Sequence, residues 1–477
     1  MNENATEENE MKRELGLLDA TMLVVGSMIG SGIFIVSADI ARYVGSAGWL
    51  ILIWVLTGLI TLSAALSYGE LSAMFPKAGG QYVYLREAYN KLVAFLFGWS
   101  MFTVIQTGTI AAVGVAFAKF TAYIFPVVSD KNILFEAGWF KLNAAQILSI
   151  CVIILLTWIN SRGVRNGKII QTLFTATKIL SLFGLVIFGL TSGFRAEVWS
   201  TNWSDAWTAM SWSADTGTAT TIGASVLFAG IISSMVGSLF SSDAWNNVTF
   251  IAGEIRNPQR NIGLSLFFGT LIVTLIYVSA NVMYTAVLPM KEIAFAPSDR
   301  VAVAASQYVF GESGTLIIAV MIMISTFGCN NGLILSGARV YFTMAQDGLF
   351  FKQAAVLNRF EVPAWGLWVQ GIWAGLLCLS GGYGSLLDYV VFVVLIFYIL
   401  TIWGIFRLRK SRPEMPRPYK AFGYPVVPAL YILLAAVICI GLLIYKTDTC
   451  GWGLLIVLLG IPVYYLTKGE LKKSGVK

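Results

Sequence analysis

Long apolar runs alternate with short polar stretches along almost the whole chain. Twelve runs are close to the roughly 20 mostly apolar residues that an α-helix needs to cross a bilayer. They cover residues 17–42, 48–74, 91–124, 143–160, 168–192, 220–252, 262–288, 314–346, 363–380, 385–407, 427–445 and 451–467. This pattern predicts an all-α membrane protein with twelve transmembrane helices.

The composition supports this interpretation and excludes several classes of protein. Of the 477 residues, 57% are hydrophobic and only 12% are charged, whereas a soluble domain carries about 25% charged residues. The chain contains no histidine, which removes the commonest transition-metal ligand and the usual base of a catalytic triad. Its five cysteines form no C-x-x-C pair. We therefore expect no metal, no cofactor and no enzymatic activity.

The positions of the basic residues predict the orientation. With the N-terminus in the cytoplasm, the segments on that side hold nearly three times as many Lys and Arg residues as the segments on the other side. The basic excess is thus expected to contact membrane lipids, with no nucleic acid as partner. The acidic start of the chain lacks the features of a secretory signal, so the first run is expected to remain as a span. We expect both termini to be cytoplasmic, in the plasma (inner) membrane.

The first apolar run contains a poor helix interior, because three glycines and two serines fall between Gly26 and Gly32. Each glycine costs about 1 kcal/mol relative to alanine in a helix. One interpretation is a discontinuous helix, whose second half would begin near Ser31 and present free N–H groups to an anion. The alternative is close helix packing, because Gly26 and Gly30 have the small-xxx-small spacing.

The sixth run is interrupted by polar residues that include Ser241 and Asp243. A carboxylate inside the membrane costs roughly 2.5–3.5 kcal/mol and needs a partner or a water-filled cavity. Breaks in the first and sixth of twelve helices are in corresponding positions if two five-helix halves repeat, and such a pair indicates a midplane site of a secondary transporter. The alternative is that this run does not span the membrane and that Asp243 lies in a loop.

Two further features are unusual for their positions. Lys178 lies about ten residues into the fifth run. Either its side chain extends toward the cytoplasmic surface, or it faces the interior, where an ammonium can hold the carbonyls of a broken helix as a sodium ion would. The outside loop 192–220 carries Trp199, Trp203, Trp207 and Trp212. We expect this loop to lie on the membrane surface.

Three motifs carry a resemblance to a known family. The run Gly26–Phe34 resembles the first-helix motif of the amino acid–polyamine–organocation superfamily, and 245–261 and 417–420 resemble segments of its L-type amino acid transporters. The resemblance implies a leucine-transporter-type fold of two inverted five-helix repeats with broken helices 1 and 6. The implied divisions are a cytoplasmic tail 1–16, repeats 17–192 and 220–407, two additional helices in 427–467, and a cytoplasmic tail 468–477.

The resemblance also implies a substrate site. The α-carboxylate would meet N–H groups at Ser31 and Gly32, and the α-amino group would meet carbonyls at the ends of the two half-helices. Phe240 matches the aromatic residue that closes over substrate, and Lys178 matches the lysine that replaces sodium in sodium-independent members. The expected substrate-binding residues are Ser27, Met28, Ile29, Gly30, Ser31, Gly32, Phe240, Ser241 and Asp243.

Two departures from the family pattern matter. Animal L-type members carry a cysteine between the third and fourth segments that joins a glycoprotein partner, and the loop Phe125–Asn143 has none. We therefore expect a bacterial transporter with no disulfide-linked heavy chain. Asp243 stands where many neutral amino acid transporters have a small residue. It can pair with a cationic side chain, relay a proton, hydrogen-bond a hydroxyl, or be held by Lys178 or neighbouring backbone.

The sequence thus predicts a sodium-independent secondary transporter whose substrates are amino acids. Neutral amino acids are expected, carried by exchange or with protons, through alternating access. One alternative is a transporter of cationic amino acids or polyamines that uses Asp243 for the substrate side chain. A channel is an alternative from another class, although two unlike broken helices do not form the repeated filter that a pore needs.

Overall fold

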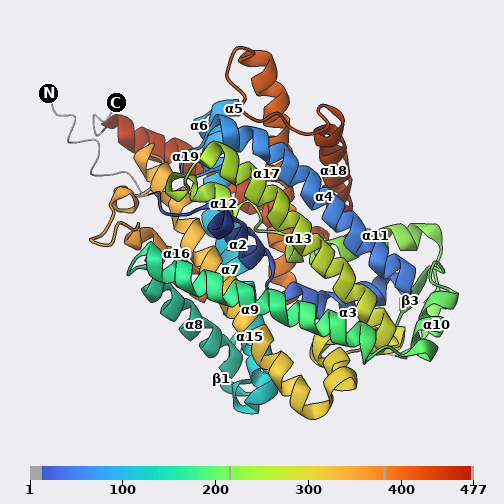
Figure 1. Ribbon diagram of the computed structural model, residues 1–477. Helices are drawn as coiled ribbons and strands as arrows, with labels where there is room; N and C mark the ends of the chain where they lie inside the picture. The colour runs from blue at the N-terminus through green and yellow to red at the C-terminus, as the bar shows by residue number, and fades with distance from the viewer. Residues whose placement is uncertain (1–12, 139, 214–215, 380–382, 474–477) are drawn as a thin grey trace.

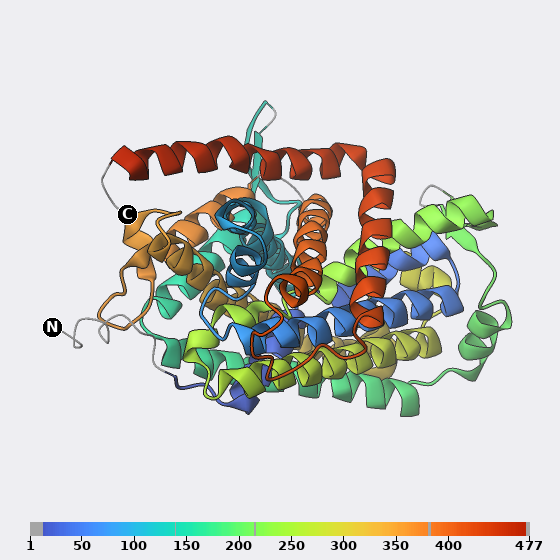
Figure 2. The ribbon, with the colours of Figure 1, turned by 90° about the horizontal axis from the view of Figure 1, so that it is seen from above.

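The computed structural model describes residues 13–138, 140–213, 216–379 and 383–473, and helices make up most of it (Figure 1). The predicted terminal tails fall partly outside this range, because residues 1–12 and 474–477 are not described. Helices α4 (Ala47–Met74), α9 (Val164–Thr191) and α13 (Pro258–Val287) lie side by side in both views, whereas α19 (Thr447–Lys473) lies across one face of the molecule (Figures 1 and 2).

The first part of the chain, up to residue 191, forms helices and one β-hairpin. The helices are α2 (Leu17–Met28), α3 (Gly32–Val44), α4 (Ala47–Met74), α5 (Gln81–Ala88), α6 (Lys91–Ser100), the π-helix η1 (Met101–Ile105), α7 (Gln106–Ile124), the 3-10 helix η2 (Pro126–Val128), α8 (Ala144–Asn160) and α9 (Val164–Thr191). The hairpin consists of β1 (Ile133–Ala137) and β2 (Phe140–Asn143), which pair antiparallel between α7 and α8.

The remainder repeats this mixture of long helices and one hairpin. Its main elements are α10 (Ala196–Ser204), β3 (Met210–Trp212), β4 (Ala219–Thr221), α11 (Ala224–Ser241), α12 (Asn247–Phe250), α13 (Pro258–Val287), α14 (Met290–Ala294), α15 (Val301–Gln346), α16 (Ala364–Leu377), α17 (Tyr383–Ser411), α18 (Val426–Tyr445) and α19 (Thr447–Lys473). Short 3-10 helices are η3 (Ala252–Glu254), η4 (Pro297–Asp299) and η5 (Lys352–Ala355).

The predicted all-helical, apolar architecture is confirmed. Within the described ranges, nine helices are long and apolar enough to cross a membrane, and α2 with α3 make a tenth span if the pair, bent by 41°, is counted as one. Two other predicted runs correspond to shorter helices, α8 with 17 residues and α16 with 14 residues. Length and composition therefore support about ten spans directly.

Glycines allow the central helices to approach closely. A Cβ on Gly58 of α4 would collide with Thr274 of α13, and a Cβ on Gly269 of α13 would collide with Val24 of α2. Small residues at such contacts are typical of helix packing in membranes. The outer helices α18 and α19 instead expose large apolar side chains, including Leu433, Ile440, Leu458 and Leu459, as a lipid-facing surface requires.

The tryptophan-rich loop folds back on the protein. Trp212 Nε1 donates a hydrogen bond to Gly45 O (3.0 Å), and Trp49 Nε1 donates to Trp207 O (3.0 Å). Of the four tryptophans in this loop, only Trp207 is exposed. The loop therefore packs against the ends of α3 and α4, and its tryptophans serve mainly this packing.

Candidate functional site

The first span is interrupted, as the glycine-rich motif predicts. Helix α2 ends at Met28, Ile29 is extended (φ −73°, ψ 92°), and α3 begins at Gly32. The first hydrogen bond of α3 runs from Phe34 N to Ser31 O (3.1 Å). Because the first amides of a helix have no intrahelical acceptor and carry the positive end of its dipole, this end of α3 can stabilise an anion.

Lys178 of α9 is directed at this break. Its side chain is fully buried, and Nζ donates hydrogen bonds to Gly26 O and Ile29 O, both at 2.7 Å. The ammonium therefore does not extend toward the membrane surface. It holds two carbonyls that the unwound backbone leaves without helical partners, and an unpaired carbonyl at this depth would be costly.

A tyrosine connects the first break with the second. Tyr277 OH of α13 lies 3.1 Å from Met28 O and 2.9 Å from Ser241 O, so a single buried hydroxyl lies within hydrogen-bond distance of carbonyls at both breaks. On the other side of the first break, Cys329 Sγ of α15 donates to Ser27 O (3.0 Å). The carbonyls at the end of α2 thus contact donors from three different helices.

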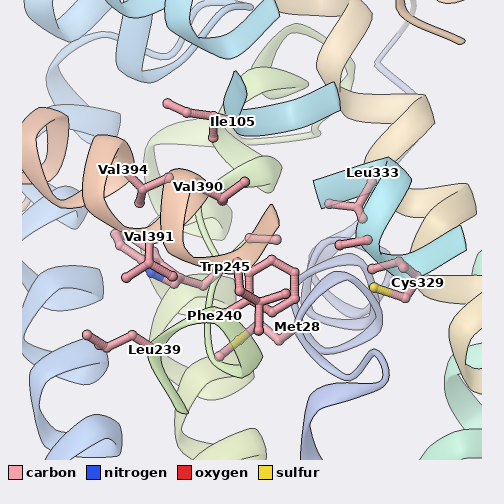
Figure 3. Packing of buried hydrophobic residues seen from close by; sticks show 14 of the residues in the cluster. Met28, Ile105, Leu239, Phe240, Trp245, Cys329, Leu333, Val390, Val391 and Val394 are labelled. Carbon is pink, nitrogen blue, oxygen red and sulfur yellow. The ribbon is translucent and has the colours of Figure 1, made fainter. Parts of the chain in front are cut away.

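The two breaks touch each other. A Cβ on Gly32 would collide with the side chain of Ser241 and lie 3.0 Å from its Cα. Phe240 is buried and belongs with Met28, Trp245 and Cys329 to the same cluster of apolar side chains (Figure 3). Gly32 of the first run and Ser241 of the sixth therefore come together in space, with Met28 and Phe240 beside them.

The second break contains a left-handed residue and a carboxylate. Helix α11 ends at Ser241, Ala244 has φ 63°, and the four-residue helix α12 follows. A non-glycine residue in this conformation is uncommon and is found at functional sites. The neighbouring Asp243 is partly buried, and its Oδ1 accepts a hydrogen bond from Tyr398 OH of α17 (2.6 Å). Tyr398, and not Lys178, therefore provides the observed side-chain partner of this carboxylate.

Two cavities meet at Asp243 and Tyr398. One is a narrow cavity of about 10 Å³, and its lining residues are Gln81, Phe97, Met101, Ile105, Gln106, Thr109, Asp243, Ala244, Asn246, Asn247, Phe250, Leu333, Val394 and Tyr398. The other, of about 20 Å³, lies between α4, the second break, α17 and α18. Both are mainly apolar with a few polar groups, and each has room for about one water molecule. Neither lining includes the expected substrate-binding residues of the first break.

The first cavity is bordered by an irregular helix and an amide network. Met101 and Ile105 belong to the π-helix η1, and such turns are frequent at functional sites. Asn246 Nδ2 donates to Gln81 Oε1 (2.9 Å), and Gln81 Nε2 donates to Thr401 Oγ1 (3.0 Å). This network links the second break to α5 and α17, so the polar wall of the cavity is held in place.

Some of these residues carry no signal in the sequence. Tyr277 and Tyr398 lie inside long apolar runs, where a tyrosine is unremarkable, and only the folded helices bring their hydroxyls to the breaks. Among the described residues, no group of three or more Cys, Asp or Glu side chains is placed to hold a metal ion.

Comparison with known proteins gives full-length matches. The sequence model of a family described as amino acid permease matches residues 15–464. The serine/threonine exchanger SteT of Bacillus subtilis is 31% identical over 463 residues, which are 96% of this chain and 98% of that protein. The mouse Asc-type amino acid transporter 1 is 30% identical over 97% of this chain and 82% of its own length. The human large neutral amino acids transporter small subunit 2 is 30% identical over 96% of this chain and 80% of its own length.

Proposed function

Because the chain belongs to the amino acid permease family, we propose that it is a sodium-independent exchanger of neutral amino acids that works by alternating access. The observation that carries this proposal is the contact between two helix breaks, with the Lys178 ammonium hydrogen-bonded to the carbonyls of the first. Its long apolar helices agree with this role. The relatives reported above are named as exchangers or transporters, and none is named as an enzyme.

An amino acid zwitterion has two charged groups that fit the two kinds of helix end. Its α-carboxylate binds the first amides of α3 at Ser31 and Gly32, where the helix dipole is positive. Its α-ammonium binds carbonyls at the ends of α2 and α11, which are those of Met28, Ile29, Phe240 and Ser241. Each carbonyl has two lone pairs, so the ammonium can share Met28 O and Ser241 O with the Tyr277 hydroxyl. Ser27 and Gly30 complete the backbone lining, and Phe240 covers the substrate.

The proposed independence of sodium follows from Lys178. In transporters with broken helices, unwound carbonyls coordinate the coupling cation. Here a covalently attached ammonium lies at hydrogen-bond distance from two such carbonyls and takes the place of such a cation. Transport therefore needs no sodium at this position.

The complete topology is also part of the proposal. Counting α8 and α16 as spans, with α11 and α12 as the broken sixth, gives twelve, arranged as inverted repeats 17–192 and 220–407 with two further helices in 427–467. The distribution of Lys and Arg supports cytoplasmic termini in the plasma or inner membrane. The loop between α7 and α8 has no cysteine, which supports a transporter without a disulfide-linked heavy chain.

Counterflow in proteoliposomes tests this function. Vesicles preloaded with an unlabelled neutral amino acid should accumulate labelled serine or threonine saturably, and replacing external sodium with choline should leave the rate unchanged. If none of the twenty amino acids shows saturable uptake, the proposed transport function is wrong. A strict sodium requirement would contradict only the role of Lys178.

A second substrate class is favoured by one observation. Asp243 lines both cavities, and a carboxylate there can bind a cationic amino acid or a polyamine. Because this carboxylate already accepts a hydrogen bond from Tyr398, a neutral side chain with a hydroxyl group fits with less rearrangement. Competition by twenty amino acids and a polyamine against labelled serine, at two pH values, separates the two classes.

A further inference from the structure

The β1–β2 hairpin between α7 and α8 exposes an unusual amount of apolar surface. All five residues of β1 are exposed, and a two-stranded hairpin without cover is marginally stable in water. Phe125, Val127, Ile133, Leu134 and Phe135 are each between 46% and 69% exposed, and we call these five side chains the hairpin patch. A patch of this kind normally marks a surface that contacts another partner.

The hairpin patch is fixed in position by hydrogen bonds within its own loop. Asn132 connects its two sides, because Asn132 Nδ2 donates to Val127 O (2.8 Å) while Asn132 O accepts from Ala144 N (3.0 Å). A capping box between Asn143 and Gln146 then starts α8 directly after β2. The register shifts between Ile133 and Phe135, which places a bulge at Leu134, and a bulge re-aims side chains within a strand. The patch is therefore preformed and attached to the ends of two helices.

The patch continues an exposed apolar surface on the neighbouring helix. Helix α8 exposes Ile147, Ile154, Leu155 and Trp158 along its length. With 17 residues, α8 is about 25 Å long at 1.5 Å per residue, which is shorter than the hydrocarbon core of about 30 Å. The hairpin patch lies at the end where α8 begins, and it extends the apolar surface beyond the end of this short helix.

The second hairpin provides a contrast within the same molecule. Strand β3 packs on the end of α3, where a Cβ on Gly45 would collide with Met210, and the β3 residues are half-buried. Thus two hairpins of similar size differ in their cover. Strand β3 rests on protein, whereas the described side chains of β1 have no comparable cover.

We propose that the hairpin patch inserts into the headgroup–acyl boundary of the bilayer and serves as a membrane anchor that compensates for the short α8. Lys131 is exposed beside the patch, where it can meet lipid phosphates, whereas the neighbouring Lys141 pairs with Glu136 (2.7 Å). The partner is therefore lipid, whatever amino acid the protein transports.

An environment-sensitive dye tests this assignment. Cys151 is the exposed cysteine and the other four are buried, so a Cys151→Ser background accepts a single new cysteine. Leu134→Cys, labelled with the fluorophore NBD, reports on the patch, and Thr220→Cys on the exposed part of β4 is the matched control. Both proteins are reconstituted in phosphatidylcholine nanodiscs, with and without lipids that carry a nitroxide near the headgroup.

The label at position 134 should emit at shorter wavelength and be quenched about twofold or more by the nitroxide lipids, because interfacial segments lie about 5–10 Å inside the boundary. The label at position 220 should remain water-like. A water-like, unquenched label at 134 would overturn the proposal. Shielding that depends on protein concentration, without quenching by nitroxide lipids, would assign the patch to a second copy of the chain and would also overturn it.

Discussion

At the scale of single residues, the site depends on side chains that replace lost helical hydrogen bonds. Lys178 contacts Gly26 O and Ile29 O, and Tyr277 contacts Met28 O and Ser241 O. A buried acceptor that loses its donor costs about 1–3 kcal/mol. These side chains therefore stabilise the unwound backbone at the breaks. Substituting them should lower both the stability of the protein and its transport rate.

Removing the charge of Lys178 should impair transport strongly. Lys178→Met keeps most of the side-chain volume but leaves Gly26 O and Ile29 O without their ammonium donor. Losing one or both bonds, at about 1–3 kcal/mol each, should lower counterflow by about tenfold or more. Lys352→Met, at an exposed lysine of η5, is the control and should have wild-type rates. Full activity of a folded Lys178→Met protein would show that the ammonium is dispensable.

Gly30 tests the close approach of the first break to α15. A Cβ at this position would lie 3.1 Å from Cys329 Sγ, and the larger side chain of valine must displace that helix. We expect Gly30→Val to abolish uptake. Gly184 on α9 has open space around an added Cβ, so Gly184→Val should transport normally. Normal uptake by folded Gly30→Val would count against the proposed site.

The pair Asp243–Tyr398 allows the roles of the carboxylate to be separated. Asp243→Asn keeps an oxygen that can accept from Tyr398 OH, whereas Tyr398→Phe removes the donor, which is worth about 1.5–3 kcal/mol for a bond to a charged group. We expect Asp243→Asn to retain neutral amino acid uptake and Tyr398→Phe to reduce it.

The pattern of losses identifies the function of Asp243 in uptake assays at two pH values. Loss of cationic substrates alone would mean that the carboxylate recognises a side chain. Loss of pH dependence alone would mean that it carries a proton. A variant unchanged in both respects would leave Asp243 with a structural role.

At the scale of elements, ion pairs connect different helices to one another at each end of the molecule. Near the end of α3, Arg42 Nη1 contacts Asp299 Oδ1 of η4 at 2.9 Å, and Lys119 Nζ of α7 contacts Asp299 Oδ2 at 3.5 Å. Toward the other end, Arg339 Nε of α15 contacts Glu254 Oε1 of η3 at 2.9 Å in a fully buried pair. Alternating access requires each end to open in turn, so these contacts must break separately.

Asp299→Asn should weaken the first of these contacts. The substitution removes the charge that both Arg42 and Lys119 approach, and Asp299 is partly exposed, so a modest change of about two- to fivefold in transport rate is expected. In the Cys151→Ser background, access of a thiol reagent to a cysteine introduced at Ser37 of α3 should increase as this end opens. Exposed Asp130→Asn is the control, and an unchanged labelling rate in Asp299→Asn would argue against a gating role.

At the scale of the whole molecule, the bilayer makes some features predictable and leaves others to tertiary contacts. Apolar runs of sufficient length must become helices, because no other structure satisfies the backbone hydrogen bonds of an isolated segment in lipid. The glycines from 26 to 32 predict the first break, because glycine is a poor helix former. The sequence could not predict Tyr277 or Tyr398 as partners, because they reach the breaks from segments distant along the chain. It also did not predict the short helix α12 or the exposed hairpin, which depend on how neighbouring helices pack.

The hydroxyl of Tyr277 has a consequence for how the specificity of this protein can evolve. Because one atom lies close to carbonyls of both interrupted helices, neither backbone can drift in position without disturbing the other. Mutations that move the backbone of either helix are thus expected to be eliminated by selection. Changes of substrate preference should accumulate instead among the side chains around Asp243, where the cavities can be reshaped while the shared backbone frame is inherited unchanged.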